Sequence, residues 1–393
     1  MVFDACAARE ARLTMRLHVP GFARRSKIGV DLGDDAIRLV QMDQRGHRVL
    51  AAALLQRPAF DDGGLRDRSN LDFKQQLKRA LRRGRFVGSQ CVIGAPRELV
   101  HVHPVRVPQM PAKELEASLA WESEDRFGIP REHLQVDGVV TGARSTSVDD
   151  DRTEVVVFAM DTREAEPWLA PLLAAGLAPV AMEPGFSAVA RAHCRRVRRE
   201  QDRERTRVVL DMGYAGTTLL FMRGDRIGFV KTFEIGGAAL DKALAESIGM
   251  DVQAAAALRR DRRHAARGAR QLDTTADAGV ADAAKPLLHE LAGAVGLCLR
   301  HCAVSFRGNR PECLILSGRE GDEPGLQAML EERCGIEITT DDESETLSTL
   351  ARDLAAFGLD DEDPGAWAAA MGLAIRPARA ASISRASGKG HAA

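Results

Sequence analysis

The residues best suited to chemistry follow a short apolar strand near the middle of the chain. The segment 208–221 reads VVLDMGYAGTTLLF and combines an acid, two glycines and a hydroxyl: Asp211, Gly213, Gly216 and Thr217. A hairpin turn with two glycines lets backbone N–H groups approach a phosphate, and a threonine can add a hydroxyl donor. An aspartate at the end of a buried strand can hold hydrated Mg²⁺. The pattern is equally typical of a plain β-hairpin with an aspartate cap.

A second copy of the pattern favours the phosphate-binding interpretation. Residues 27–40 read KIGVDLGDDAIRLV, so Asp31 and Gly33 follow an apolar strand as Asp211 and Gly213 do. Both copies have the order strand, Asp-x-Gly, strand, turn, strand. After the second copy, a Gly-Gly pair interrupts the strand period and a helix is predicted over Gly237–Ile248.

The two hairpins need a scaffold that holds them in place, and we expect it to be two α/β domains. A chain of 393 residues is long enough for two domains that each bury a core. We predict a basic extension (1–26), a first domain (27–204), a second domain (205–377) and a disordered tail (378–393). Within them we expect a polar loop at 61–69, helices at 71–83 and 112–126, and a solvated basic helix and loop at 259–270.

Composition excludes several classes of function. The chain is 45% hydrophobic with a net charge of −1, which predicts neither nucleic-acid binding nor a membrane-bound protein. No apolar run approaches the roughly 18 residues of a transmembrane helix. Seven scattered cysteines predict reduced thiols in the cytoplasm. Cys298 and Cys302 flank His301 on a predicted helix; buried thiols and a metal site lacking two further ligands are the alternatives.

The order of five motifs resembles a known family. They are IGVDLG from Ile28, VPQMP followed by a helix with Trp-Glu, MEPGFSAVARA, LDMGYAGTTLLF and AAAMGLAIRP. Together they look like the PilM-type type IV pilus assembly proteins of the actin-like ATPase superfamily, which are related to FtsA. The resemblance covers nearly the whole chain and implies a two-domain actin-like α/β fold. It implies that the first domain carries an inserted small α/β subdomain (97–182), and that the last helix of the second domain returns to the first.

The resemblance also implies ATP and Mg as cofactors. The phosphate-binding positions would be Asp31, Gly33, Asp35, Asp211, Gly213, Gly216, Thr217, Gly236 and Gly237. Gly318 would approach the adenosine, and Asp31 and Asp211 would hold Mg²⁺ through water.

Three departures from the family pattern weaken the case for an ATPase. Asp34 and Asp35 stand where hydroxyl side chains are usual, and a carboxylate about 4 Å from a phosphate charge costs on the order of 4 kcal/mol at an effective dielectric near 20. Arg319 replaces a second glycine. Glu183, the acid of a Glu-Pro element, is not a clear general base. We therefore expect a scaffold with a weak or degenerate nucleotide site.

The resemblance finally implies a partner, the short cytoplasmic tail of a bitopic PilN-like inner-membrane protein. The tail would bind a groove beside the inserted subdomain, with Pro108 on one wall and Trp121 as anchor; ordinary core packing is the alternative role of Trp121. The protein would be cytoplasmic and peripheral to the inner membrane, with possible self-association. The alternative functions are a small-metabolite kinase of the same superfamily and an FtsA-like, filament-forming division protein.

Overall fold

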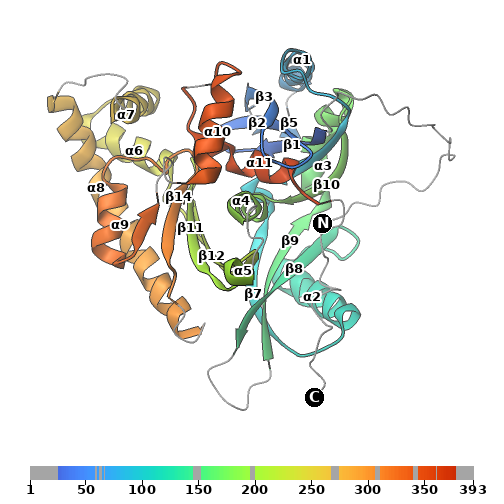
Figure 1. Ribbon diagram of the computed structural model, residues 1–393. Helices are drawn as coiled ribbons and strands as arrows, with labels where there is room; N and C mark the ends of the chain where they lie inside the picture. The colour runs from blue at the N-terminus through green and yellow to red at the C-terminus, as the bar shows by residue number, and fades with distance from the viewer. Residues whose placement is uncertain are drawn as a thin grey trace.

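The computed structural model describes most of the chain between Arg25 and Pro377 (Figure 1). The described ranges are 25–57, 60–61, 64–65, 67–144, 152–194, 200–266, 274–305, 310–339, 344–359 and 361–377. The basic extension up to residue 24, the last part of the basic run (267–270) and the tail from residue 378 lie outside them.

The first of two five-stranded sheets has the order β10-β6-β1-β2-β3. Its strands are β1 (Arg25–Leu32), β2 (Ala36–Asp43), β3 (Val49–Gln56), β6 (Gln90–Ala95) and β10 (Ala178–Pro184). The first three form an antiparallel meander, and β6 and β10 join in parallel. The central strand carries a nearly continuous apolar run because both its faces are covered. Its register places Asp31 between Arg38 on β2 and Gly94 on β6.

The second sheet repeats this plan with the order β13-β12-β11-β14-β15. Its strands are β11 (Thr206–Met212), β12 (Thr217–Arg223), β13 (Arg226–Phe233), β14 (Cys313–Ser317) and β15 (Glu337–Thr339). Asp211 lies between Thr218 on β12 and Ser317 on β14, which matches the placement of Asp31 in the first sheet. The predicted duplication is therefore present in strand order and in register.

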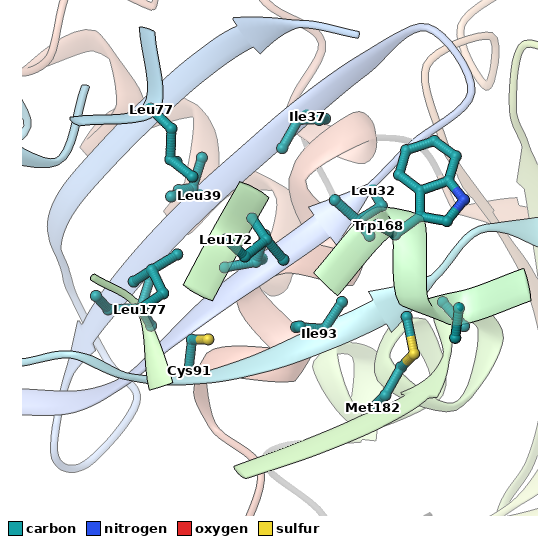
Figure 2. Close-up of a cluster of buried hydrophobic side chains, with 14 of the residues drawn as sticks. Leu32, Ile37, Leu39, Leu77, Cys91, Ile93, Trp168, Leu172, Leu177 and Met182 are labelled. Atoms are coloured by element: carbon teal, nitrogen blue, oxygen red, sulfur yellow. The ribbon is translucent and has the colours of Figure 1, made fainter. Parts of the chain in front are cut away.

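Side chains from one face of the first sheet and from two helices form the core beneath it. The helices are α1 (Asp67–Arg83) and α3 (Thr162–Ala174). Figure 2 shows the cluster, which includes Leu32, Ile37, Leu39, Leu77, Ile93, Trp168 and Leu172. Burying each such side chain contributes about 1.5–3 kcal/mol. This packing fixes β1, and therefore the position at which Asp31 leaves the sheet.

Two helices pack closely against the other face of the first sheet. They are α4 (Gly185–Cys194) and α11 (Ala368–Ala374), which follows η2 (Pro364–Trp367) and α10 (Glu345–Ala355). A Cβ atom on Gly372 would lie 1.8 Å from the carbonyl oxygen of Ala188, and one on Gly29 would lie 2.1 Å from that of Ala370. Glycine is required at both contacts, because any side chain would force the helices and the strand apart.

The inserted segment forms a separate three-stranded antiparallel sheet of order β7-β9-β8. Its elements are η1 (Arg97–Leu99), β7 (His101–Pro108), α2 (Ala112–Phe127), β8 (Leu134–Arg144) and β9 (Arg152–Asp161). Leu115 and Leu119 of α2 are buried against this sheet. Within the described residues, no metal-binding cluster forms around His101 and His103 of β7, and the rings of His101 and Phe127 stack with 4.8 Å between their centroids.

Helices α6 (Gly237–Ile248), α8 (Thr274–Ser305) and α9 (Leu326–Cys334) pack on the second sheet. Helix α7 (Val252–Ala266) packs on α6 and α8, and the short α5 (Glu200–Glu204) precedes β11. Within α8, the stretch Asp277–Val304 is long and apolar enough to cross a membrane by length and composition. The sequence-based search for apolar runs missed it. Leu288, Leu291 and Val295 of this helix are buried in the core of the second sheet, which favours a core helix.

Several local expectations are confirmed and one is wrong. Helix α6 has the predicted bounds, and α2 extends one residue beyond them. The polar loop predicted at 61–69 is wrong, because this segment includes parts of a small hairpin, β4 (Phe60–Asp61) and β5 (Gly64–Leu65), and α1 begins at Asp67. The first turn of α1 reads DRSN and lacks the apolar spacing on which the prediction rested. Cys298 and Cys302 are free thiols, and no metal-binding cluster forms within the described residues.

Candidate nucleotide site

A cleft of about 480 Å³ opens between the two sheets, where β1 and β11 end. Both predicted hairpins line it, and the turn after β14 closes a third side. The structure thereby brings together seven predicted residues: Asp31, Gly33, Asp35, Asp211, Gly213, Gly216 and Gly318.

Three predicted residues do not line this cleft and instead support the second hairpin. Thr217 is fully buried, and its hydroxyl donates to the carbonyl of Ile235 at 2.6 Å. Side chains alternate along a strand, so the hydroxyl that lines the cleft belongs to the next residue, Thr218. Gly237 donates its N–H to the Gly213 carbonyl at 3.1 Å. A Cβ on Gly236 would lie 2.5 Å from a hairpin nitrogen, so the Gly-Gly pair packs behind the turn.

The two strand-end carboxylates have unusual protonation. Burial raises the pKa of Asp31 to about 7; Arg38 opposes this effect and the charge of Asp211 adds to it. Burial also raises the pKa of Asp211 to about 6, although a hydrogen bond with Ser317 lowers it. Because both pKa values are raised, these two carboxylates favour a bound proton or a bound cation near neutral pH.

On the first hairpin, Asp35 does not repel phosphate in the way that the sequence predicts. Asp35 accepts two hydrogen bonds from Arg38, at 3.0 and 2.8 Å, and one from Arg319 at 2.6 Å. Burial alone would raise the pKa of Asp35, but these guanidinium groups outweigh it and hold the value at about 2. Its negative charge is thus balanced within the protein, and the assumption of an unbalanced carboxylate was wrong.

Arg38 was missed at the sequence level. It is 3% exposed on β2, within the segment IRLV. A lone cation in an apolar strand was the available signal, since a buried guanidinium must have a partner.

Other arginines tie the two sides of the cleft together. Arg97, from the first side, donates to the carbonyl of Phe233 at 3.2 Å and to Glu234 at 3.2 Å on the second side. Arg319, from the second side, donates to Asp35 on the first side. Its guanidinium lies 5.7 Å from the ring centre of Tyr214. The cleft is therefore bridged by ion pairs and hydrogen bonds.

Three arginines of the basic run, Arg259, Arg262 and Arg263, are buried, so the prediction of a solvated segment was wrong for these side chains, although Arg260 on the same helix is exposed. Arg259 is 2% exposed and contacts Asp241 at 2.5 Å, Glu320 at 2.7 Å and Glu323 at 2.6 Å. Burial raises the pKa values of Asp241 and Glu323, and Arg259 opposes that shift. Arg263 also pairs with Glu320. We call Asp241, Arg259, Arg263, Glu320 and Glu323 the buried ion cluster.

Glu183 is engaged in structural contacts. Its carboxylate accepts hydrogen bonds from Arg191 at 2.5 and 3.0 Å and from Arg376 at 2.7 Å. It is 5% exposed and joins β10 to α4 and to the chain after α11. This pairing supports a structural role for Glu183, which links these segments, over the role of a general base.

The residues fit one part of Mg-ATP and not the other. Glycines and two half-buried carboxylates at the cleft suit phosphates and a hydrated Mg²⁺, which needs few protein ligands. On the adenosine side, Arg319 lies at the mouth and the buried ion cluster fills the space between α6, α7 and the turn after β14. Opening that side would separate buried charges, which is costly.

Two sheets of the same strand order, with paired Asp-x-Gly hairpins facing one cleft, define an actin-like fold. Solved structures agree: a chain of the PilM–PilN type IV pilus biogenesis complex is 23% identical, with a TM-score of 0.71 over 90% of this chain and 99% of that one. The ethanolamine utilization protein EutJ from Carboxydothermus hydrogenoformans is 16% identical, with a TM-score of 0.52 over 91% of each chain.

Residues 29–378 match the family model of type IV pilus assembly protein PilM, and the chain belongs to this family. No curated protein matches the chain significantly.

Proposed function

We propose that the protein is a cytoplasmic adaptor in type IV pilus assembly, which binds the short cytoplasmic tail of a bitopic PilN-like protein at the inner membrane. Membership of the PilM family supports the pilus system. The likeness to a chain from a PilM–PilN complex supports the kind of partner.

The observation that carries this proposal is the exposure of Trp121. On α2, Leu115 and Leu119 face the inserted sheet, whereas Trp121 is 69% exposed. It is the most exposed large apolar side chain in the described ranges, so its alternative role in core packing is wrong. Exposed tryptophans that become buried on binding often dominate interface energies. Trp121 is therefore suited to anchor an apolar residue of the tail.

Prolines give the neighbouring backbone a fixed shape. Pro104 and Pro108 lie on β7, which is an edge strand of the inserted sheet, and Pro111 precedes α2. Proline fixes φ and has no N–H to offer an added strand. Side-chain contacts along this wall would therefore recognise the tail at a low ordering cost.

In this proposal, the nucleotide site is a weak or degenerate one. When bound, Mg-ATP would supply negative charge and a cation between the two hairpins. Arg38 and Arg319 would orient the phosphates, and Asp31 and Asp211 would hold the hydrated metal. The adaptor role does not depend on hydrolysis, and the pairing of Glu183 with two arginines disfavours the kinase alternative.

The adaptor function is tested by titrating the tail peptide of the PilN-like membrane protein into the purified protein. We expect Trp121→Ala to weaken binding at least about tenfold, or roughly 1.4 kcal/mol, with unchanged melting temperature. Leu297→Ala on α8 is the matched control, because Leu297 is 61% exposed in the second domain.

Equal binding by Trp121→Ala and the wild type would remove α2 from the interface. A variant in which a short linker replaces residues 102–158 then tests the inserted sheet and α2 while α3 and β10 stay in place, and circular dichroism establishes that it folds. Failure of the wild type to bind the tail at all would contradict the adaptor function.

A further inference from the structure

A second cavity, of about 470 Å³, lies at the carboxyl ends of α4 and α11. Earlier residues of these same helices line the nucleotide cleft, so the two cavities share a framework but no lining residue. The start of β1 and the turn between β2 and β3 complete the second cavity, which we call the basic cavity. Its charged lining residues are Arg25, Lys27, Asp43, Arg45, Arg191 and Arg376.

The charge of this lining is strongly unbalanced. Four arginines and a lysine meet a single lining carboxylate, that of Asp43. That carboxylate is engaged, because its Oδ1 accepts the backbone N–H groups of His47 and Arg48 at 2.6 and 3.2 Å. Glu183, which does not line the cavity, pairs with Arg191 and Arg376 and balances part of their positive charge. Positive charge is thus concentrated at this cavity, although the chain as a whole has a net charge of −1.

Three of the guanidinium groups are held in place by the fold. Arg25 donates to the carbonyl of Arg85 at 2.8 Å, and Glu183 holds Arg191 and Arg376. Arg191 also donates to the carbonyl of Gly372 at 2.9 Å. Guanidinium groups fixed in this way lose little conformational freedom when they bind an anion.

Two further cations on the lining have no partner of this kind. Lys27 is half-buried and Arg45 is exposed, and neither makes an ion pair with any residue that the structure describes. The turn that carries Arg45 is fixed, because Gly46 has a φ of +70° and a Cβ there would lie 2.8 Å from Ile375. These two side chains can therefore close over a ligand that the fixed arginines receive.

We propose that the basic cavity is a binding site for a phosphate-bearing anion, supplied as a soluble phosphate ester or as a phospholipid headgroup. Several fixed guanidinium groups match the oxygen geometry of phosphate, and multiple cations favour a group with more than one charged or strongly accepting oxygen. The cavity is large enough for a glycerophosphate group. The site is separate from the nucleotide cleft, and the inference does not depend on the proposed adaptor function.

The proposal is tested with inorganic phosphate and glycerol phosphate in calorimetry, and with vesicles of phosphatidylglycerol and phosphatidylcholine in co-sedimentation. The test variant is Lys27→Ala/Arg45→Ala. The matched control is Arg223→Ala/Arg226→Ala, which removes two exposed cations from the hairpin between β12 and β13. Circular dichroism and melting temperature establish that all three proteins are folded.

We expect the wild type and the control to bind at least one phosphate source, and the test variant to bind it about tenfold or more weakly. Binding of the free esters identifies a soluble ligand, whereas binding of phosphatidylglycerol vesicles alone identifies a lipid headgroup. The interaction should weaken as salt increases. The proposal is overturned if neither source binds, or if the test variant binds as tightly as the control.

Discussion

The two sides of the nucleotide cleft share one backbone plan and hold their charges differently. On the first side, Asp35 faces the cleft and is balanced by Arg38 and Arg319. On the second side, glycines form the turn, and the charges lie behind it in the buried ion cluster. The comparison teaches that a duplicated hairpin determines where a ligand can approach, while distant side chains decide how much of the ligand fits.

The largest predicted effect tests the second side. Arg259→Met should destabilise the protein by about 3–5 kcal/mol, because it leaves the carboxylates of Asp241, Glu320 and Glu323 buried without their main cation. Urea unfolding at pH 7 measures the loss. Arg260→Met is the control, since Arg260 is exposed on the same helix and should change stability by no more than about 0.5 kcal/mol. Similar small losses for both variants would mean that the cluster is not buried.

A second prediction compares the strand-end carboxylates through pH. The pKa of Asp31 is about 7 in the folded protein and near 3.9 when unfolded, so the folded state binds more protons between these values. This group's contribution to stability therefore falls as pH rises from about 4 to 7. Asp31→Asn removes that loss and should increase stability at pH 8 by on the order of 3 kcal/mol, with little change at pH 4.

Urea unfolding across this range, with EDTA present, measures the difference between wild type and Asp31→Asn. Asp225→Asn, on the exposed β12–β13 turn, serves as the control. Stability curves for Asp31→Asn and wild type that run parallel from pH 4 to 8 would contradict the raised pKa.

The smallest predicted effect concerns how Asp35 and Arg319 change the affinity of the cleft for Mg-ATP. Wild-type protein should bind Mg-ATP weakly. Asp35→Ser should strengthen binding about tenfold, because it releases Arg38 and Arg319 toward the phosphates. Arg319→Ala should change affinity in the opposite direction, since it removes a cation and leaves Asp35. Calorimetry with Mg-ATP measures all three, and equal affinities would show that these charges do not face the ligand.

Much of the fold was predictable from local patterns. The two copies of strand, Asp-x-Gly and strand predicted two similar hairpins, and the structure repeats the same strand order in both sheets. The bounds of α6 followed from a Gly-Gly break and apolar spacing. Such patterns are readable because alternation and helical periodicity depend on neighbours in the sequence.

The charged residues were harder to predict, and the errors have one cause. The run RRDRRHAARGAR reads as a solvated segment, yet Arg259 pairs with acids 61 and 64 positions away. Asp35 reads as repulsive, yet Arg319 reaches it across 284 positions. Sequence spacing does not reveal which side chains meet when two sheets close on each other.

By itself, the sequence determined the family, the duplicated hairpins and the positions of Asp31 and Asp211, because each depends on contiguous motifs. Only the tertiary structure decided that Thr218 rather than Thr217 lines the cleft, that Trp121 is exposed, and that cations from four separate segments surround one cavity. The physical reason is that burial and ion pairing are properties of packed surfaces. A side chain's surroundings are fixed only when elements distant in the chain come together.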